Sequence, residues 1–167
     1  MVILRPAVAE DIDFILATER LPGNDRFIGQ WTAERHLALM QAPGSQYLIG
    51  EDETGAAQGY VMITELDDRH GNIYLHRIAV AAPGQGFGRR LLRAVTEWVF
   101  ARPTAHRMWF NMFADNDRAH HVYRTSGFRQ EGRLREARLR ADGTRCDSLI
   151  FSMLRSEWLS RPASATP

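Results

Sequence analysis

The stretch YLHRIAVAAPGQGFGRRLL, residues 74–92, decides the fold of this chain. Its first part is an apolar run typical of a β-strand, and this run ends at Val80. A glycine-rich turn follows, and an amphipathic helix is predicted directly after the turn. The glycines at 84, 86 and 88 let backbone amides approach one anion without obstruction by a Cβ atom. Because the start of a helix adds free N–H groups and a positive dipole end, the segment predicts a phosphate-binding loop.

Two common phosphate-binding patterns do not fit this loop. A Walker-type loop requires Lys-Ser or Lys-Thr after its last glycine, and neither dipeptide follows these glycines. A dinucleotide-binding fingerprint that starts at Gly86 requires a third glycine where Leu91 stands. On these residues alone, a tight strand-to-helix turn without a ligand is the alternative to a phosphate site.

A second motif, NDRAHHVYRTSGF, covers residues 116–128. Asn116, Ala119 and Tyr123 are spaced so that they fall on one face of a helix. Asp115 or Asn116 can cap the start of this helix, and Gly127 can end it before a strand begins. The small residue at 119 permits close approach of a ligand, and the Asn116 amide offers both hydrogen-bond donors and an acceptor.

Together the two motifs resemble the pyrophosphate loop and the later signature of the GNAT superfamily, the acetyl-CoA-dependent N-acetyltransferases. The family's loop usually has Arg or Gln, two variable residues, Gly, a variable residue, and Gly or Ala. Gly86 and Gly88 fit this pattern, whereas Pro83 stands where Arg or Gln is usual. The later signature, N-x-x-A/R-x-x-x-Y-x-x-x-G-F, matches throughout. The resemblance spans the chain from a strand at Val2 to a last strand near Leu154.

The resemblance implies an α/β (α+β) GNAT fold with a mixed, mostly antiparallel central sheet of about six to seven strands and about four flanking helices. In this family the sheet splays at strand four, which here ends near Val80. The apolar periodicity and the turn residues predict the elements independently. We expect strands over residues 2–5, 47–51, 59–65, 73–80, 107–113, 128–132 and 147–154, and helices over 9–17, 32–41, from 87 onward and over 116–126.

The activity implied by the resemblance is transfer of an acetyl group from acetyl-CoA to a primary amine by direct attack in a ternary complex. The acceptor is then a small molecule or a protein N-terminus: a protein N-terminal amine, a polyamine, an amino acid or another small amine. A pattern at 127–135, G-F-x-x-E-G-x-x-R, resembles the branch that holds ribosomal-protein N-terminal acetylases and polyamine acetylases. The alternative function is a non-catalytic CoA-binding regulatory module of the same fold.

The resemblance assigns the cosubstrate to the end of strand four, the glycine loop and the helix of the second motif, and it implies no metal. Arg89 and Arg90 fit this assignment, because positive charge in the first turn opposes the helix dipole unless a phosphate lies nearby. The alternative is that both arginines are solvated surface residues. The residues expected to bind acetyl-CoA are Ile78, Ala79, Val80, Gly84, Gln85, Gly86, Phe87, Gly88, Arg89, Arg90, Asn116, Ala119 and Tyr123.

Tyr123 occupies the general-acid position of the family, where a phenol can protonate the departing CoA thiolate. The alternative for Tyr123 is a packed aromatic residue. The base that takes the amine proton is open between His76, Glu65 and a chain of water molecules. Strict alternation puts His76 on one strand face with Tyr74 and Ile78, and an unperturbed imidazole with a pKa near ~6.5 suits a base.

The composition is that of an ordinary globular enzyme, with 44% hydrophobic and 25% charged residues in 167. We expect one acetyltransferase domain over residues 1–158 and a flexible tail over 159–167. The net charge of +1 gives no indication of nucleic-acid binding, and no apolar run is long enough to cross a membrane. The single cysteine, Cys146, excludes an internal disulfide, which is compatible with the cytoplasm. A homodimer is one option for the assembly.

Overall fold

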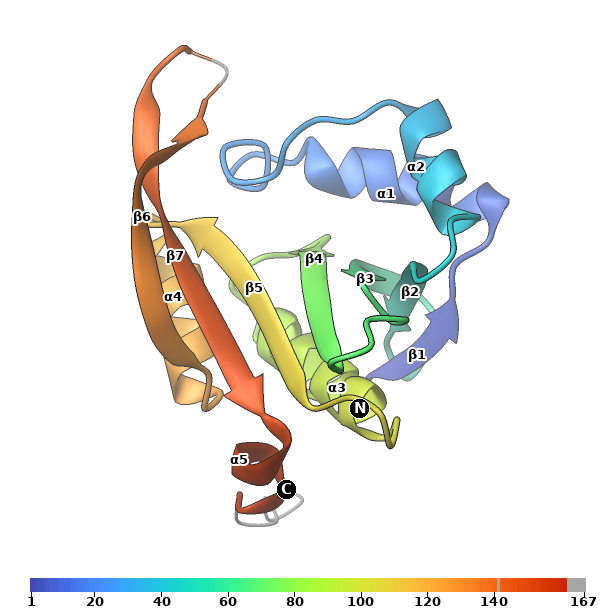
Figure 1. Ribbon diagram of the computed structural model, residues 1–167. Helices are drawn as coiled ribbons and strands as arrows, with labels where there is room; N and C mark the ends of the chain where they lie inside the picture. The colour runs from blue at the N-terminus through green and yellow to red at the C-terminus, as the bar shows by residue number, and fades with distance from the viewer. Residues whose placement is uncertain (141, 162–167) are drawn as a thin grey trace.

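One mixed sheet organises the computed structural model of the protein, which describes residues 1–140 and 142–161 (Figure 1). Its strands are β1 (Ile3–Pro6), β2 (Gln46–Glu51), β3 (Ala57–Thr64), β4 (Asn72–Val80), β5 (Arg107–Phe113), β6 (Arg129–Leu139) and β7 (Arg145–Leu154). They lie in the order β1-β2-β3-β4-β5-β7-β6, and β4–β5 is the one parallel pair among them. This confirms the predicted mixed, mostly antiparallel sheet.

The described helical elements are a 3₁₀ turn and five α-helices. The expected four helices are present, and α5 is an additional short helix that directly follows β7. The elements are η1 (Ala9–Asp11), α1 (Ile12–Glu19), α2 (Ala33–Met40), α3 (Phe87–Phe100), α4 (Asp117–Thr125) and α5 (Arg155–Leu159).

Two apolar cores lie on opposite faces of the sheet. On one face, Leu91 and Val95 of α3 pack with inward side chains of the central strands, and α4 adds Tyr123 to the edge of this core. On the other face, Ile15 of α1 packs with Tyr60 of β3, and partly buried residues of α2 join them. The sheet therefore separates a core built around α3 from a core built around α1.

The parallel pairing between β4 and β5 is short. It joins Asn72 to Arg107, Ile73 to Met108 and Tyr74 to Trp109, and no further pair joins these two strands, whose residues are all described. From there β4 stays paired with β3 and β5 stays paired with β7, so the two halves of the sheet diverge (Figure 1). We call the unpaired part after Tyr74 and Trp109 the splay. The predicted splay is confirmed, and it opens earlier on strand four than Val80.

A β-bulge in β4 changes the predicted direction of one side chain. Met62 pairs with Arg77 and Ile63 pairs with Leu75, so His76 is an extra residue without a partner opposite it. The His76 ring lies with Tyr74 on the α1–α2 face, whereas Ile78 packs toward α3. The expectation that His76 and Ile78 share a face is therefore wrong, because a bulge shifts the alternation by one residue.

Strand β6 is much longer than the predicted 128–132. The stretch after Gly132 is rich in arginine and glutamate, so it has no apolar alternation that predicts a strand. It forms the edge of the sheet, where pairing with β7 stabilises the backbone and burial is not required. A register shift between Leu134 and Arg138 bends the strand, and Glu136 adopts a positive φ of 50° there.

The predicted domain boundary at residue 158 falls inside α5. Beyond α5, the Arg161 guanidinium donates to the backbone carbonyl of Ser126. The rest of the predicted tail, 162–167, lies outside the described residues. Within the described ranges, no helix is long and apolar enough to cross a membrane.

Candidate active site

The glycine loop ends in a helix start that has no side-chain cap. Gly86 is the N-cap of α3 and has a φ of 76°, and Gly84 has a φ of 93°. These left-handed conformations favour glycine, and they direct the chain from Val80 into the first turn of α3. This turn contains no acidic residue, so its N–H groups and its dipole are available to an anion. The geometry fits the predicted phosphate loop.

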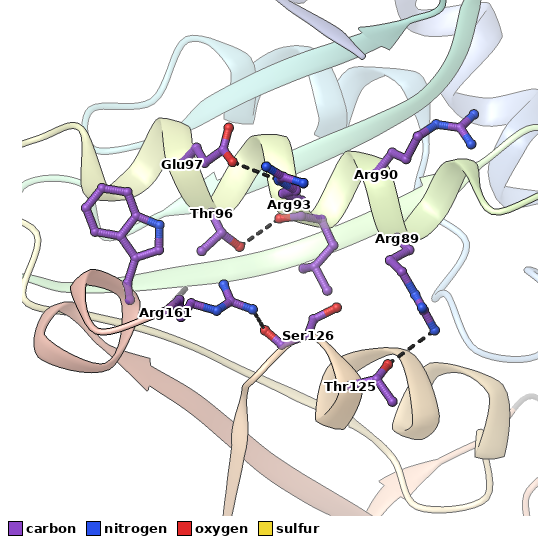
Figure 2. Close-up of a pocket in the computed structure, with 10 residues that line it drawn as sticks. Arg89, Arg90, Arg93, Thr96, Glu97, Thr125, Ser126 and Arg161 are labelled. Atoms are coloured by element: carbon purple, nitrogen blue, oxygen red, sulfur yellow. Dashed lines mark hydrogen bonds and ion pairs between the residues drawn. The ribbon is translucent and has the colours of Figure 1, made fainter. Parts of the chain in front are cut away.

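The two arginines of this first turn point in different directions (Figure 2). Arg89 extends to α4, where its guanidinium donates to the Thr125 hydroxyl at 3.2 Å. Arg90 points away from α4, with its guanidinium 5.4 Å from the centre of the Phe87 ring. Both arginines line a hollow of about 500 Å³ between α3, the end of α4 and α5, and Arg89 reaches across it to α4. Arg93, Glu97, Thr125, Trp158 and Arg161 also line this hollow.

Asn116 caps α4, since its side-chain oxygen accepts the backbone N–H of Ala119 at 3.1 Å. Asn116 and Ala119 therefore lie at the start of the helix, as the second motif predicts. Of the two caps considered, Asn116 is the one that forms.

Tyr123 lies against the strand at which the splay opens. Its ring centre is 4.2 Å from that of Phe110, the residue that follows the last paired residue of β5. Phe128 and Phe151 pack around the same ring. Desolvation by this packing raises the pKa of the Tyr123 phenol to about 12, so the hydroxyl keeps its proton at neutral pH.

His76 approaches the splay from the opposite face of the sheet. Its ring centre lies 5.3 Å from the rings of both Trp31 and Tyr74. Burial, followed by the charges of Arg77, Arg138 and Arg35, lowers the pKa of His76 to about 4. The expectation of an unperturbed imidazole is therefore wrong, because desolvation and three guanidinium groups all disfavour the protonated form. At neutral pH His76 is uncharged.

Glu65 lies beside the paired end of β4 and β5 rather than at the open splay. It is exposed in the turn after β3, with a positive φ of 63°. Its carboxylate accepts the Trp109 indole N–H at 3.3 Å, and Trp109 belongs to the last β4–β5 pair. The carboxylate is thus on the same face as His76, but it lies farther from the open strand edges.

A buried ionic cluster under this face was not predicted. The Glu19 carboxylate is 1% exposed and accepts hydrogen bonds from the Tyr60 hydroxyl and the Arg77 guanidinium. His36 lies 3.4 Å from the same carboxylate. Burial opposes ionisation of Glu19, but hydrogen bonds from His36 and Tyr60 and the charge of Arg77 hold the pKa of its carboxyl below the usual value. The cluster ties α1 and α2 to β3 and β4.

Asn24 is a second residue that the sequence did not reveal. It lies between α1 and α2, and its side-chain amide donates to the carbonyl of Val80 at 3.1 Å and to that of Thr18 at 2.8 Å. The loop between α1 and α2 is therefore attached to the end of β4, next to the glycine loop. A lone asparagine in a polar loop carries no pattern that predicts such a contact.

These features define an acetyltransferase of the GNAT class. Residues 16–128 match the acetyltransferase (GNAT) family, and the chain belongs to this family. This membership confirms the predicted fold and the predicted use of acetyl-CoA by the class.

The particular relatives are spermidine acetyltransferases. The chain is 30% identical over 120 residues to the spermidine N(1)-acetyltransferase of Vibrio cholerae serotype O1, an alignment that spans 68% of this chain and 65% of the relative. The fold is similar to that of the V. cholerae spermidine N-acetyltransferase solved in complex with CoA and spermine, with a TM-score of 0.85, 21% identity and coverage of 95% and 98%. A mutant form of the V. cholerae enzyme SpeG gives a TM-score of 0.81 at 23% identity, with coverage of 96% and 97%.

The lowered pKa of His76 generates a testable dependence of stability on pH. The unfolded chain binds a proton at His76 near pH 6.5, whereas the folded chain resists it down to about pH 4. The free energy of unfolding should therefore fall through this group as the pH decreases across that window, and the contribution is complete above it. We expect His76→Gln to flatten this part of the profile, measured by urea unfolding at a series of pH values. Parallel profiles for the two proteins would contradict the prediction.

Proposed function

We propose that the protein transfers the acetyl group of acetyl-CoA to a primary amine that binds on the α1–α2 face of the splay. The observation that carries this proposal is the arrangement around the splay. Tyr123 approaches it from the α3–α4 face through Phe110, and His76 approaches it from the α1–α2 face through the bulge. The anion-binding start of α3 lies at the end of β4.

The strand edges support a site for the pantetheine arm. After Tyr74 and Trp109 the facing backbone groups of β4 and β5 are not paired with one another, so they are free to bond amide groups of a ligand. The first turn of α3 would hold the pyrophosphate, with Arg89 beside it. The Asn116 amide, whose oxygen already caps α4, retains its two N–H donors for the ligand.

In the reaction, the amine nitrogen attacks the thioester carbonyl, a C–N bond forms and the C–S bond breaks. The protonated phenol of Tyr123 is suited to deliver the proton that the departing thiolate takes up. The uncharged imidazole of His76 is suited to accept a hydrogen bond from the amine, and it can pass the amine proton to water. Its low pKa makes it a weak base, so a water chain through His76 fits better than complete transfer to the ring.

A non-catalytic CoA-binding module is the alternative. The protonated Tyr123 at the sulfur side and the neutral His76 at the amine side argue for an enzyme, since a module that only binds CoA requires neither. Release of free CoA thiol from acetyl-CoA, measured with a panel of amines, separates the two functions. The names of the relatives make a polyamine one candidate acceptor. A homodimer stays a prediction.

Replacing Gly86 tests the phosphate loop. Gly86→Val should weaken CoA binding about tenfold to a hundredfold, because a β-branched residue disfavours the φ of 76° and displaces amides that bond the phosphate. Isothermal titration calorimetry with CoA measures this loss. Gly143→Val is the matched control, since Gly143 has a φ of 81° in the β6–β7 turn. Equal CoA affinity in Gly86→Val and in the wild-type protein would remove the loop from the site.

Removing the Tyr123 hydroxyl tests the general acid. Tyr123→Phe should lower kcat by ~10² to 10⁴-fold with little change in the Kd of CoA, because the proton matters as the thiolate develops. Steady-state thiol release and calorimetry measure the two quantities. Tyr47→Phe is the control for the loss of a phenol hydroxyl, since Tyr47 lies in the core on the other face of the sheet and contacts His36. A full kcat in Tyr123→Phe would mean that solvent supplies the proton.

The pH profile tests the amine side. If His76 assists deprotonation, the acidic limb of kcat/KM should lie near pH 4 and should move in His76→Ala, because protonation of the ring removes its hydrogen-bond acceptor. Glu65→Gln is the paired variant. A limb that moves in Glu65→Gln and stays in His76→Ala assigns the role to Glu65. If the acidic limb is unchanged in both variants, removal of the amine proton is assigned to water.

A further inference from the structure

Aromatic rings and one amide form the α1–α2 face of the splay. Tyr74 and Trp109 lie 4.5 Å apart between ring centres, and His76 lies next to both Tyr74 and Trp31. The side chain of Asn111 accepts the Tyr74 hydroxyl at 3.2 Å. We call this surface the acceptor wall, and it consists of Trp31, Tyr74, His76, Trp109, Asn111 and Phe113.

Arg138 of β6 reaches the centre of this wall. Its guanidinium donates to the Asn111 side-chain oxygen, the same atom that accepts the Tyr74 hydroxyl. It also lies 5.4 Å from the centre of the Phe113 ring. Its polar partner is therefore neutral, and within the described part of the chain no carboxylate lies at ion-pair distance from it.

A second guanidinium without a carboxylate partner lies at the other end of the wall. Arg35 and Arg77 lie over the Trp31 ring, 3.9 and 3.6 Å from its centre. Glu19 neutralises Arg77, whereas no described carboxylate forms an ion pair with Arg35. The His76 ring thus lies between the rings of Trp31 and Tyr74. Arg35 lies over the Trp31 ring, and the Tyr74 hydroxyl bonds the same Asn111 oxygen as Arg138.

The rim of the wall is also richer in arginine than in carboxylate. Arg26, from the loop between α1 and α2, and Arg140, from the end of the β6–β7 hairpin, share the single carboxylate of Asp115 at 2.7 and 2.6 Å. Figure 1 shows this loop arching over the diverging ends of β4 and β5 toward the hairpin. Within the described residues, Glu65 is the one carboxylate that accepts a hydrogen bond from the wall, at the Trp109 indole. Burial is the first cause of the lowered pKa of His76, and the charges of Arg77, Arg138 and Arg35 lower it further.

A polyamine fits this wall poorly. An ammonium group at the middle of the wall would lie near Arg35 or Arg138. Glu19 and Asp115 are already engaged with other arginines, which leaves Glu65 at Trp109 as the one wall carboxylate for several ammonium groups. Like charges at such distances repel, and partial burial strengthens the repulsion. An acceptor with a carboxylate gains an ion pair instead, because a guanidinium presents several N–H donors in a geometry that matches a carboxylate.

We propose that the acceptor is an amine of the amino-acid type, with its carboxylate on Arg138, its amino group at His76 and an apolar or aromatic remainder against Trp31 and Trp109. The proposal rests on the proposed function, since it names the acceptor of the same site. It separates this chain from its spermidine-acetylating relatives by the charge of the substrate.

The kinetic test compares acceptors that differ in one group. L-phenylalanine should exceed both L-phenylalaninamide and spermidine in kcat/KM by about tenfold or more, because the carboxylate adds a charge-assisted hydrogen bond. Arg138→Gln should remove the advantage over the amide. Arg129→Gln carries the same charge change on β6 with a side chain that is 78% exposed and paired with Glu157, so it should keep the advantage. Acetylation of spermidine without acetylation of L-phenylalanine overturns the proposal and leaves the acetyltransferase function intact.

A binding test does not depend on catalysis. The pKa of the His76 ring, followed by NMR, should rise when N-acetyl-L-phenylalanine binds, because the carboxylate offsets the nearby positive charge. The pKa should also rise in ligand-free Arg138→Gln, and the ligand should then have little further effect. A His76 pKa unchanged by this ligand overturns the carboxylate site. If no amine releases thiol, the proposed function fails, and this measurement still decides the carboxylate site.

Discussion

The structure depends on a parallel strand pair that stops after three residues. Each of the two strands continues with its antiparallel partner, so the sheet twists open where a ligand can bond the unpaired backbone. In the proposed reaction, this opening lets Tyr123 and His76 act from opposite faces of the sheet, although the two residues lie in different layers. If β4 and β5 remained paired through Val80, a continuous sheet would separate the two residues. The glycine loop would then lie next to no opening for a ligand.

Electrostatics divides this space into two unlike halves. The α3 half has the N–H groups of a helix start and Arg89, which would hold the phosphates in the proposed complex, while the α1–α2 half places arginines around an uncharged histidine. The buried Glu19 is essential to the second half. It holds Arg77 against Trp31 and offsets one of the positive charges, and without this carboxylate the cluster would contain an uncompensated buried cation. Burial and these arginines together lower the pKa of His76, and the same arginines are the basis of the proposed carboxylate preference.

Local patterns in the sequence predicted much of the α3 half, which is proposed to bind acetyl-CoA. The glycine loop, the α4 cap at Asn116 and the strand that ends at Val80 each depend on residues close together in the chain, and the family resemblance connected them into a fold. The acceptor half depends on distant contacts. Arg138 on β6 bonds Asn111 on β5, and Asn24 in a loop bonds Val80 on β4. Neither contact can be predicted from a periodic pattern in the sequence. The bulge at His76 also arises from pairing with β3, which is why simple alternation assigned the wrong face to Ile78.

The two cores on opposite faces of the sheet have a consequence for how such enzymes diversify. The residues proposed to hold the cosubstrate lie toward α3, while the arginines around the acceptor wall come from α2, the α1–α2 loop and the β6–β7 hairpin. Substitutions in that loop and hairpin can accumulate without repacking the core under the glycine loop, since loops tolerate change better than the elements they connect. Lineages that share one acetyl donor can therefore exchange one class of acceptor for another through a small number of surface charges.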